Sequence, residues 1–307
     1  MSEVLAEGVV AALYRYPVKS MQGEQVTELS LSTRGAAGDR ALALLDRASG
    51  LVASAHHPGK WGKLLQCSAR HGRDGAVEEI LVTLPDGEEL AAGPELERRL
   101  VVLLGREVSL IRAAPADGRY EIVHPDVPDT APESFVAQTL AAAAGPGRVG
   151  QLGLTLAAEP GGLVDVAPVH VLTTASLREL EEAGADPDVR RFRPNIVLET
   201  GGRGYVEAAW HRGTARIDSV RLQLTIPTPR CIVPTLAQRG VSADKQPLRT
   251  LARENRIAIG AGSWACLGSY ANVTAPGTVR VGDRFTVTGP SPSPPARGHS
   301  RRARCGG

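Results

Sequence analysis

Along the first third of the chain, short apolar runs rich in β-branched and aromatic residues alternate with polar, turn-forming segments. The Pro-Asp-Gly sequence at 85–87, for example, is typical of a turn that follows a strand. Many short strands at close spacing are typical of a small barrel or sandwich. Strands are predicted at Val9–Tyr16, Val26–Leu31, Ala41–Leu45, Ile80–Leu84 and Val108–Ile111.

Four segments are predicted to be helices. Pro94–Leu104 has a proline at its start and Gly105 just past its end, which is the usual asymmetry of helix termini. In Thr174–Ala183 we expect Thr174 to cap the first turn and Gly184 to end the helix. The other two helices are predicted near Ser134–Ala144 and at Pro247–Asn255.

A polar, proline-containing stretch between Ala113 and Gly150 separates two β-rich parts of the chain. We place a domain boundary there and expect a mostly β fold with a few helices (α+β). It would comprise a small N-terminal barrel-like domain at residues 1–118 and a second β-barrel domain at 119–288. Residues 289–307 are rich in Pro, Ser, Arg and Gly and offer little apolar surface to bury, so a disordered tail is expected.

The composition narrows the class of protein. Apolar residues make up 42% and charged residues 22%, as in globular proteins. No stretch approaches the roughly 20 apolar residues of a membrane-spanning helix, and the acidic N-terminus does not resemble a secretory signal. We therefore expect a cytoplasmic protein that does not bind a membrane.

The net charge of +2 is uneven along the chain, because the predicted tail contains four arginines and no acid. The rest of the chain therefore has a net charge of −2. Only 4% of the residues are aromatic, so side chains that could stack on bases are scarce. Nucleic-acid binding is not expected.

Four cysteines are widely spaced, at positions 67, 231, 266 and 305, without a C-x-x-C pair or a Cys/His cluster. A structural zinc site and a disulfide framework are therefore not expected. Cys231 differs from the others because prolines hold its segment extended and the adjacent Arg230 favours the thiolate, which is both a nucleophile and a metal ligand. A lone cysteine is more often a small core residue. Cys67 and Cys266, in apolar or mixed β-runs, fit that simpler interpretation.

Two further segments present cations at strand ends. Lys19 and Ser20 follow a strand that stops at a proline, and a cation beside a hydroxyl can bind a phosphate. A solvated surface lysine is the more common alternative. Arg40, at the end of a glycine-rich turn, could bind a phosphate or a ring carbonyl with two parallel N–H groups. An Asp39–Arg40 ion pair that closes the turn is equally compatible with the sequence.

A third segment is Arg193-Pro194-Asn195, at the start of an apolar run. The proline favours extended backbone at Arg193, which would direct its side chain at a defined angle. Asn195 offers both a donor and an acceptor, which suits the edge of a heterocycle. Arginine clusters are usually solvated, but this one is rigid.

Together these segments resemble the MOSC family, in particular its two-domain, amidoxime-reducing members. "LYRYPVKS" and "GDRALALLD" are similar to the family's N-terminal β-barrel domain. Four further motifs are similar to the MOSC domain itself: "DVAPVHVLTTASL", "RFRPNIVLE", "PRCIVPT" and "PGTVRVGD". The six motifs occur in order between Gly8 and Val287, so the resemblance covers nearly the whole chain.

The resemblance implies a molybdenum cofactor, that is, molybdopterin with bound molybdenum. Cys231 matches the thiolate that completes the metal coordination beside the pterin dithiolene and two oxygens. Asp165 and Thr173 fall where the family lines the metal side of the site, and Asp165 is a second candidate for the chemistry. The remaining matches are contacts to the pterin and its phosphate: Lys19, Ser20, Arg40, Arg193, Asn195 and Arg230.

The implied activity is reduction of N-hydroxylated compounds such as amidoximes, hydroxamic acids and N-hydroxy bases. An external reductase is the expected electron donor, because no cysteine run for an iron–sulfur domain follows Val287. Two alternatives remain open. One is a sulfur carrier that holds a persulfide on Cys231, and the other is a cofactor carrier without turnover.

Two departures from the family pattern lie close to Cys231. Pro229 stands where members often have serine or another small polar residue, so one cofactor hydrogen bond would be missing. Ala237-Gln238 replaces the usual Asp-Pro, which weakens any inference about the substrate side of the site.

Overall fold

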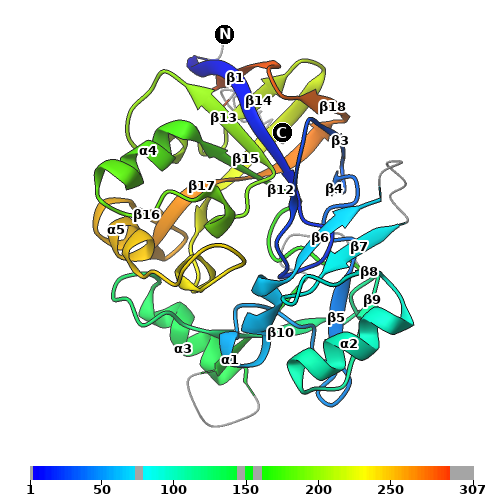
Figure 1. The fold of residues 1–307 in the computed structure, drawn as a ribbon. Coiled ribbons are helices and arrows are strands. Elements are labelled where there is room, and N and C mark those ends of the chain that lie inside the picture. Colours follow the sequence, from blue (N-terminus) through cyan, green and yellow to red (C-terminus); the bar gives the residue numbers. More distant parts are fainter. Residues whose placement is uncertain (1–2, 73–78, 144–148, 155–160, 291–307) are drawn as a thin grey trace, which may run out of the picture.

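The centre of the molecule is a closed barrel of seven strands, seen in the upper half of Figure 1. The computed structural model describes residues 3–72, 79–143, 149–154 and 161–290. Around the barrel the strands follow the order β12 (Val169–Thr173), β13 (Ile196–Thr200), β1 (Val4–Arg15), β19 (Arg284–Thr288), β14 (Thr214–Ile217), β15 (Val220–Pro229) and β17 (Gly262–Ala275). A β12–β17 pairing closes the ring. β12 and β13 are parallel and the other neighbours are antiparallel. The expectation of a mostly β, barrel-containing fold is confirmed.

The barrel strands fill the interior by alternation. In β15 the side chains of Val220, Leu222 and Leu224 are fully buried, whereas Arg221 between them is exposed. Such alternation places every second residue inside a closed sheet. The interior is therefore a packed apolar core and not a channel, and ligands must bind outside it.

The first strand of the chain belongs to this barrel. β1 pairs with β13 on one side and with β19 on the other, so the barrel takes strands from both sides of the boundary expected near residue 118. The register places Leu13 opposite Ile196, and the N–H of Tyr14 donates to the carbonyl of Asn195 (2.9 Å). This register brings the residues that follow β1 close to those that precede β13.

A second region is built from small sheets and α2 (Pro94–Leu104) around its own apolar core. Its sheets are β5 (Ala43–Asp46) with β9 (Val108–Ile111), and β6 (Ser68–His71) with β7 (Ile80–Thr83) and β8 (Glu89–Ala91). It also contains α1 (Pro58–Trp61) and the 3-10 helix η1 (Gly62–Gln66). The bounds predicted for α2 and β9 are confirmed.

Several short strands lie beside the barrel. These are β2 (Glu24–Val26), which pairs with β1; β3 (Glu28–Ser32), which pairs with β4 (Gly35–Ala36) and β18 (Gly277–Arg280); and β16 (Arg256–Ile259), which pairs with β17. A further pair, β10 (Arg119–Val123) and β11 (Val149–Gly153), lies with the second region instead, because the N–H of Val52 donates to the carbonyl of Arg119 (2.9 Å). The run predicted as one strand at Val26–Leu31 is thus divided between β2 and β3, which pair with different partners.

Helices α4 (Thr174–Glu182) and α5 (Gln246–Glu254) cover one side of the barrel (Figure 1). The cap predicted at Thr174 is wrong by one residue, because the hydroxyl of Thr173 accepts the N–H of Ser176 (3.1 Å). The remaining helices are α3 (Glu133–Ala141) and the 3-10 helices η2 (Val189–Arg191), η3 (Val206–Trp210) and η4 (Val233–Thr235).

Among the described residues, no helix has the length and apolar character that crossing a bilayer requires. From residue 291 onward, the tail predicted at 289–307, with its Cys305, lies outside the described part of the chain.

Candidate functional site

A cavity lies where the end of β15 faces the residues that follow β1 and β5. Its lining includes eight of the nine residues predicted for the site: Lys19, Ser20, Arg40, Asp165, Arg193, Asn195, Arg230 and Cys231. These residues come from both barrel and non-barrel segments, so the fold gathers positions as far apart as 19 and 231 around one space.

Strand pairing accounts for part of this gathering. Asn195 precedes β13, and its side-chain oxygen accepts the N–H of His170 (3.1 Å) while its amide nitrogen donates to the carbonyl of Tyr14 (3.4 Å). The amide thus joins the ends of β1, β12 and β13. In this structure the Asn195 side chain therefore holds the strand ends together. This role differs from the contact with a heterocycle edge that was expected for it.

Ser20, Arg40 and Arg193 have φ angles of 68°, 45° and 55°. Positive φ is uncommon for residues other than glycine, and such strained positions gather at functional sites. They are three of the six described non-glycine residues with positive φ. The extended backbone predicted for Arg193 is wrong, because its φ is positive. Its N–H donates to the carbonyl of Val189, the first residue of η2 (3.2 Å).

The two arginines share one aromatic ring. The guanidinium carbons of Arg40 and Arg193 lie 4.6 and 4.4 Å from the ring centre of Tyr16. Arg40 forms an ion pair with Asp39, and Arg193 donates to the carbonyl of Met21 (2.6 Å). Burial, together with the charge of Arg40, lowers the pKa of Arg193 to about 10.

Lys19 and Asp165 form an ion pair on the cavity wall. Lys19 also donates to the carbonyl of Leu163 (3.1 Å). Burial lowers the pKa of Lys19, although Asp165 opposes this effect. Burial alone would raise the pKa of Asp165, but the charges of Lys19 and His56 outweigh it and the net shift is downward. The ion pair therefore favours the charged form of Asp165.

Arg230 is buried and donates to neutral groups. Its Nε and one Nη contact the carbonyls of Thr228 (3.2 Å) and Phe192 (3.3 Å), and its other Nη lies 3.3 Å from Nε2 of His170. Burial and the adjacent Arg230 keep the pKa of His170 well below its usual range, so the imidazole is neutral. Arg230 keeps its charge without a carboxylate partner among the described residues.

The cavity therefore has a surplus of positive charge. Lys19 and Arg40 have carboxylate partners, whereas Arg193 and Arg230 have neutral acceptors only among the described residues. Desolvated charge without compensation is costly, and a phosphate monoester has a charge close to −2 at neutral pH. The residues present thus fit an anionic group such as the phosphate of a pterin.

At the other end of the lining, Cys231 follows β15 and is partly accessible. Burial alone would raise the pKa of its thiol, but the charge and hydrogen bond of His56, the N–H of Val233 and the charge of Arg230 lower it overall. Burial instead raises the pKa of Cys67 and of Cys266 to about 12. Among the three described cysteines, Cys231 is the one in an environment that favours the thiolate.

His56 was not predicted from the sequence. It lies in the segment between β5 and α1. Burial would lower its pKa, but Cys231 and Asp165 together raise it, so the net shift is upward. The sequence signal was weak: two histidines precede Pro58 at the end of an apolar run.

Thr173 lies outside the cavity. It is fully buried, caps α4, and donates to the carboxylate of Glu207 (2.7 Å). Its hydroxyl is thus engaged inside the protein, and we leave it out of the candidate site.

Gln238, at one of the departures from the family pattern, is also buried. It accepts a hydrogen bond from the side chain of Gln22 and donates to the carbonyl of Val233 (3.4 Å). The replaced position thus joins the segment after Cys231 to the segment after β1.

In the described part of the chain, no group of three or more His, Cys, Asp or Glu side chains is arranged to hold a metal ion. Cys231 is therefore a single protein ligand candidate, which suits a metal that brings its other ligands with it.

Comparison with known proteins gives two family matches. Residues 7–90 match the MOSC N-terminal beta barrel domain, and residues 160–286 match the MOSC domain. Mitochondrial amidoxime-reducing component 1 of Mus musculus is 33% identical over 132 residues, which cover 41% of this chain and 38% of the relative. Mitochondrial amidoxime reducing component 2 of Homo sapiens is 34% identical over 125 residues, which cover 39% and 36%. The matches span less than two fifths of the length of these relatives.

Among solved structures, the YUAD protein of Bacillus subtilis has a TM-score of 0.43 at 12% identity, covering 93% of this chain and 97% of that protein. YiiM of Geobacillus stearothermophilus has a TM-score of 0.29 at 13% identity, covering 40% of this chain and 54% of YiiM.

Proposed function

Because the chain belongs to the MOSC family, a family associated with the molybdenum cofactor, we propose that it is an oxidoreductase that reduces N-hydroxylated compounds. One observation supports this most directly. A single cavity is lined by a thiol with a lowered pKa and by two arginines without carboxylate partners among the described residues. A pterin phosphate and a thiolate-bound metal need these two environments in one space.

In this proposal Cys231 binds the metal, since soft thiolates suit such centres. Lys19, Arg40 and Arg193 hold the anionic part of the cofactor through charge-assisted hydrogen bonds. Ser20 accepts the N–H of Ala55 (2.9 Å), which leaves its own hydrogen to donate to the same anion. When bound, the cofactor would supply the two-electron reduction that, with two protons, removes the oxygen of an N–OH group as water.

The chain's own contribution near the substrate would be to orient it. Asp165 is ionised, partly exposed, and has one oxygen engaged by Lys19. Its other oxygen can accept the N–H of an amidoxime or a similar N-hydroxylated base. The Lys19 ammonium keeps that carboxylate charged and fixed, so the substrate would meet a preorganised acceptor.

Electrons would come from an external reductase, which we place with the protein in the cytoplasm. No redox cofactor other than molybdopterin is part of the proposal. The purified protein should therefore need a reductase system or a reduced viologen for turnover, and NADH alone should give none.

Two other functions use the same thiol. A depressed pKa also suits a cysteine that carries a persulfide, and a cofactor carrier would bind the same pterin without turnover. Of these the sulfur carrier has the more specific support, because His56 and the N–H of Val233 would favour the thiolate without a bound pterin.

The test starts from protein produced in cells that make the cofactor and are supplied with molybdate. Molybdenum per chain is measured by elemental analysis, and oxidised pterin is detected by fluorescence. Benzamidoxime reduction is then followed with reduced viologen. We expect molybdenum, pterin and turnover together. Metal without turnover would favour a carrier, and a persulfide mass on Cys231 without molybdenum would favour sulfur transfer.

A further inference from the structure

We infer that Arg191 is a positioning residue that holds the two ends of this cavity in register. It lies in η2, two residues before Arg193, and its side chain is 1% exposed. The inference rests on the proposed function for its consequence, whereas the contacts on which it is based belong to the protein itself.

Nearly all donors of Arg191 are engaged by protein acceptors. Its Nε and one Nη donate to Asp186 Oδ2 (2.9 and 2.5 Å), and its other Nη donates to the carbonyl of Pro234 (3.1 Å). A further bond reaches the carbonyl of Ser242 (2.9 Å). Arg191 lines the cavity, but with four of its five N–H groups engaged it is not itself a ligand contact.

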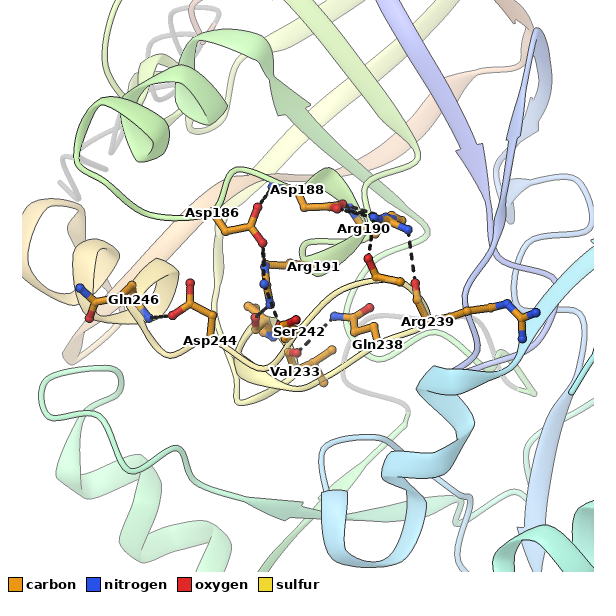
Figure 2. A network of polar contacts seen from close by, with 12 residues as sticks. Asp186, Asp188, Arg190, Arg191, Val233, Gln238, Arg239, Ser242, Asp244 and Gln246 are labelled. Atoms are coloured by element: carbon orange, nitrogen blue, oxygen red, sulfur yellow. Dashed lines mark hydrogen bonds and ion pairs between the residues drawn. The ribbon is translucent and has the colours of Figure 1, made fainter. Parts of the chain in front are cut away.

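Figure 2 shows the guanidinium of Arg191 between Asp186 and the loop that follows Cys231. Pro234 is the middle residue of η4, the turn that comes two residues after Cys231. The first residue of that turn, Val233, has the backbone N–H that helps to lower the pKa of the Cys231 thiol. The bond to the Pro234 carbonyl therefore fixes the turn whose N–H favours the thiolate.

On its other side Arg191 is part of η2, which sets the strained backbone of Arg193. The N–H of Arg193 bonds to the carbonyl of Val189, and the carbonyl of Phe192 accepts a bond from Arg230 (3.3 Å). One buried side chain thus connects the turn before Arg193 with the turn after Cys231. If the connection were lost, both turns would open locally, while the barrel strands would stay paired.

The chain provides a matched control in Arg190. It also bridges an aspartate to the same loop, pairing with Asp188 and donating to the carbonyls of Arg239 (3.3 Å) and Gly240 (3.4 Å), as Figure 2 shows. Its side chain, however, is 44% exposed. Exposed contacts of this kind contribute little.

The experiment compares Arg191→Lys and Arg190→Lys in the full chain, produced in cells without molybdopterin. Lysine keeps the charge but cannot reach two carbonyls and a carboxylate at once. We expect amide hydrogen exchange in Arg191→Lys to accelerate about tenfold at residues 192, 193, 233, 235 and 236, with β15 and β17 unchanged. Arg190→Lys should match the wild type.

A merely structural role gives a different pattern: faster exchange throughout the barrel with a lower melting temperature. That result, or unchanged exchange at either turn, would overturn the inference. Should Arg191→Lys not fold, Asp186→Asn replaces it, because Asp186 is 38% exposed and its loss frees the same guanidinium.

In protein loaded with cofactor, Arg191→Lys should lose molybdenum about tenfold faster on dilution than Arg190→Lys. If the wild type binds no molybdenum, the proposed function fails, and the exchange pattern still decides the role of Arg191.

Discussion

The two ends of the cavity are built from different kinds of backbone. At the anion end, Ser20, Arg40 and Arg193 all have positive φ. At the thiol end, Cys231 follows the barrel strand β15 and precedes the short turn η4. Holding a non-glycine residue in a sparsely populated conformation costs on the order of 1–3 kcal/mol. The anion end therefore depends on surrounding structure, and the thiol end depends on a strand that forms for other reasons.

This difference indicates that binding and chemistry can be separated by mutation. Changes at the anion end should reduce how much cofactor is held. Changes at the thiol end should alter what the bound cofactor does.

The largest effect is expected from Cys231→Ser. Loss of the thiolate should abolish reduction of N-hydroxylated substrates and alter the absorption spectrum of the metal. Much of the pterin should remain, because the phosphate contacts come from the other end. The measurements are viologen-driven turnover, the metal spectrum and pterin content. An active variant with an unchanged metal spectrum would show that Cys231 is not the metal ligand.

At the anion end, Arg193→Ala and Lys19→Ala should lower molybdenum and pterin content together. Each charge-assisted contact contributes roughly 1.5–3 kcal/mol, or about tenfold or more in affinity. Arg216→Ala, exposed on β14, is the control. Full cofactor content in both site variants, after a dilution step, would show that the anion binds elsewhere.

The other described cysteines test whether the thiol end is special. Cys67→Ser and Cys266→Ser place a hydroxyl in a buried position and should reduce the free energy of unfolding by roughly 1–3 kcal/mol. Molybdenum per folded chain should stay at the wild-type level. Denaturant titration and metal analysis decide this, and loss of metal from Cys266→Ser would point to the wrong thiol having been chosen.

The smallest effect is expected for Thr173→Val, because Thr173 lies outside both ends. Loss of the α4 cap should cost about 1 kcal/mol, and loss of the hydrogen bond to Glu207 adds to this cost. Cofactor content and turnover should not change. A lower cofactor content or turnover at an unchanged melting temperature would show that Thr173 is part of the site.

From the sequence, eight of the residues that line the cavity could be predicted, but not how they are arranged. Lys19 and Asn195 line the same cavity because the register of β1 and β13 brings the end of one strand close to the start of the other. Arg193 was assigned extended backbone from the proline that follows it. In the fold, η2 and the contact with Met21 impose a positive φ on it, and neither is visible in local sequence.

Residues that act through partners distant in sequence were the least predictable. His56 influences Cys231 across 175 positions, and Gln22 meets Gln238 across 216. From the sequence motif alone, the replacement at Gln238 suggests that a contact of the family is lost. In three dimensions it gains a buried amide partner, so the departure changes how the loop is held without removing its support.

The placement of β1 between β13 and β19 also bears on how the protein is made. On the ribosome the amino-terminal strand leaves the exit tunnel long before residues 196–200 and 284–288, with which it pairs. Until β19 has been synthesised, β1 has an unpaired edge, because its pairing with β19 joins residues 4–9 to residues 284–288. Such long-range closure slows folding and leaves partly folded chains open to association. The residues that line the cavity range from Lys19 to Tyr270, so the cavity is complete only after both have been synthesised, and any cofactor must enter after that point.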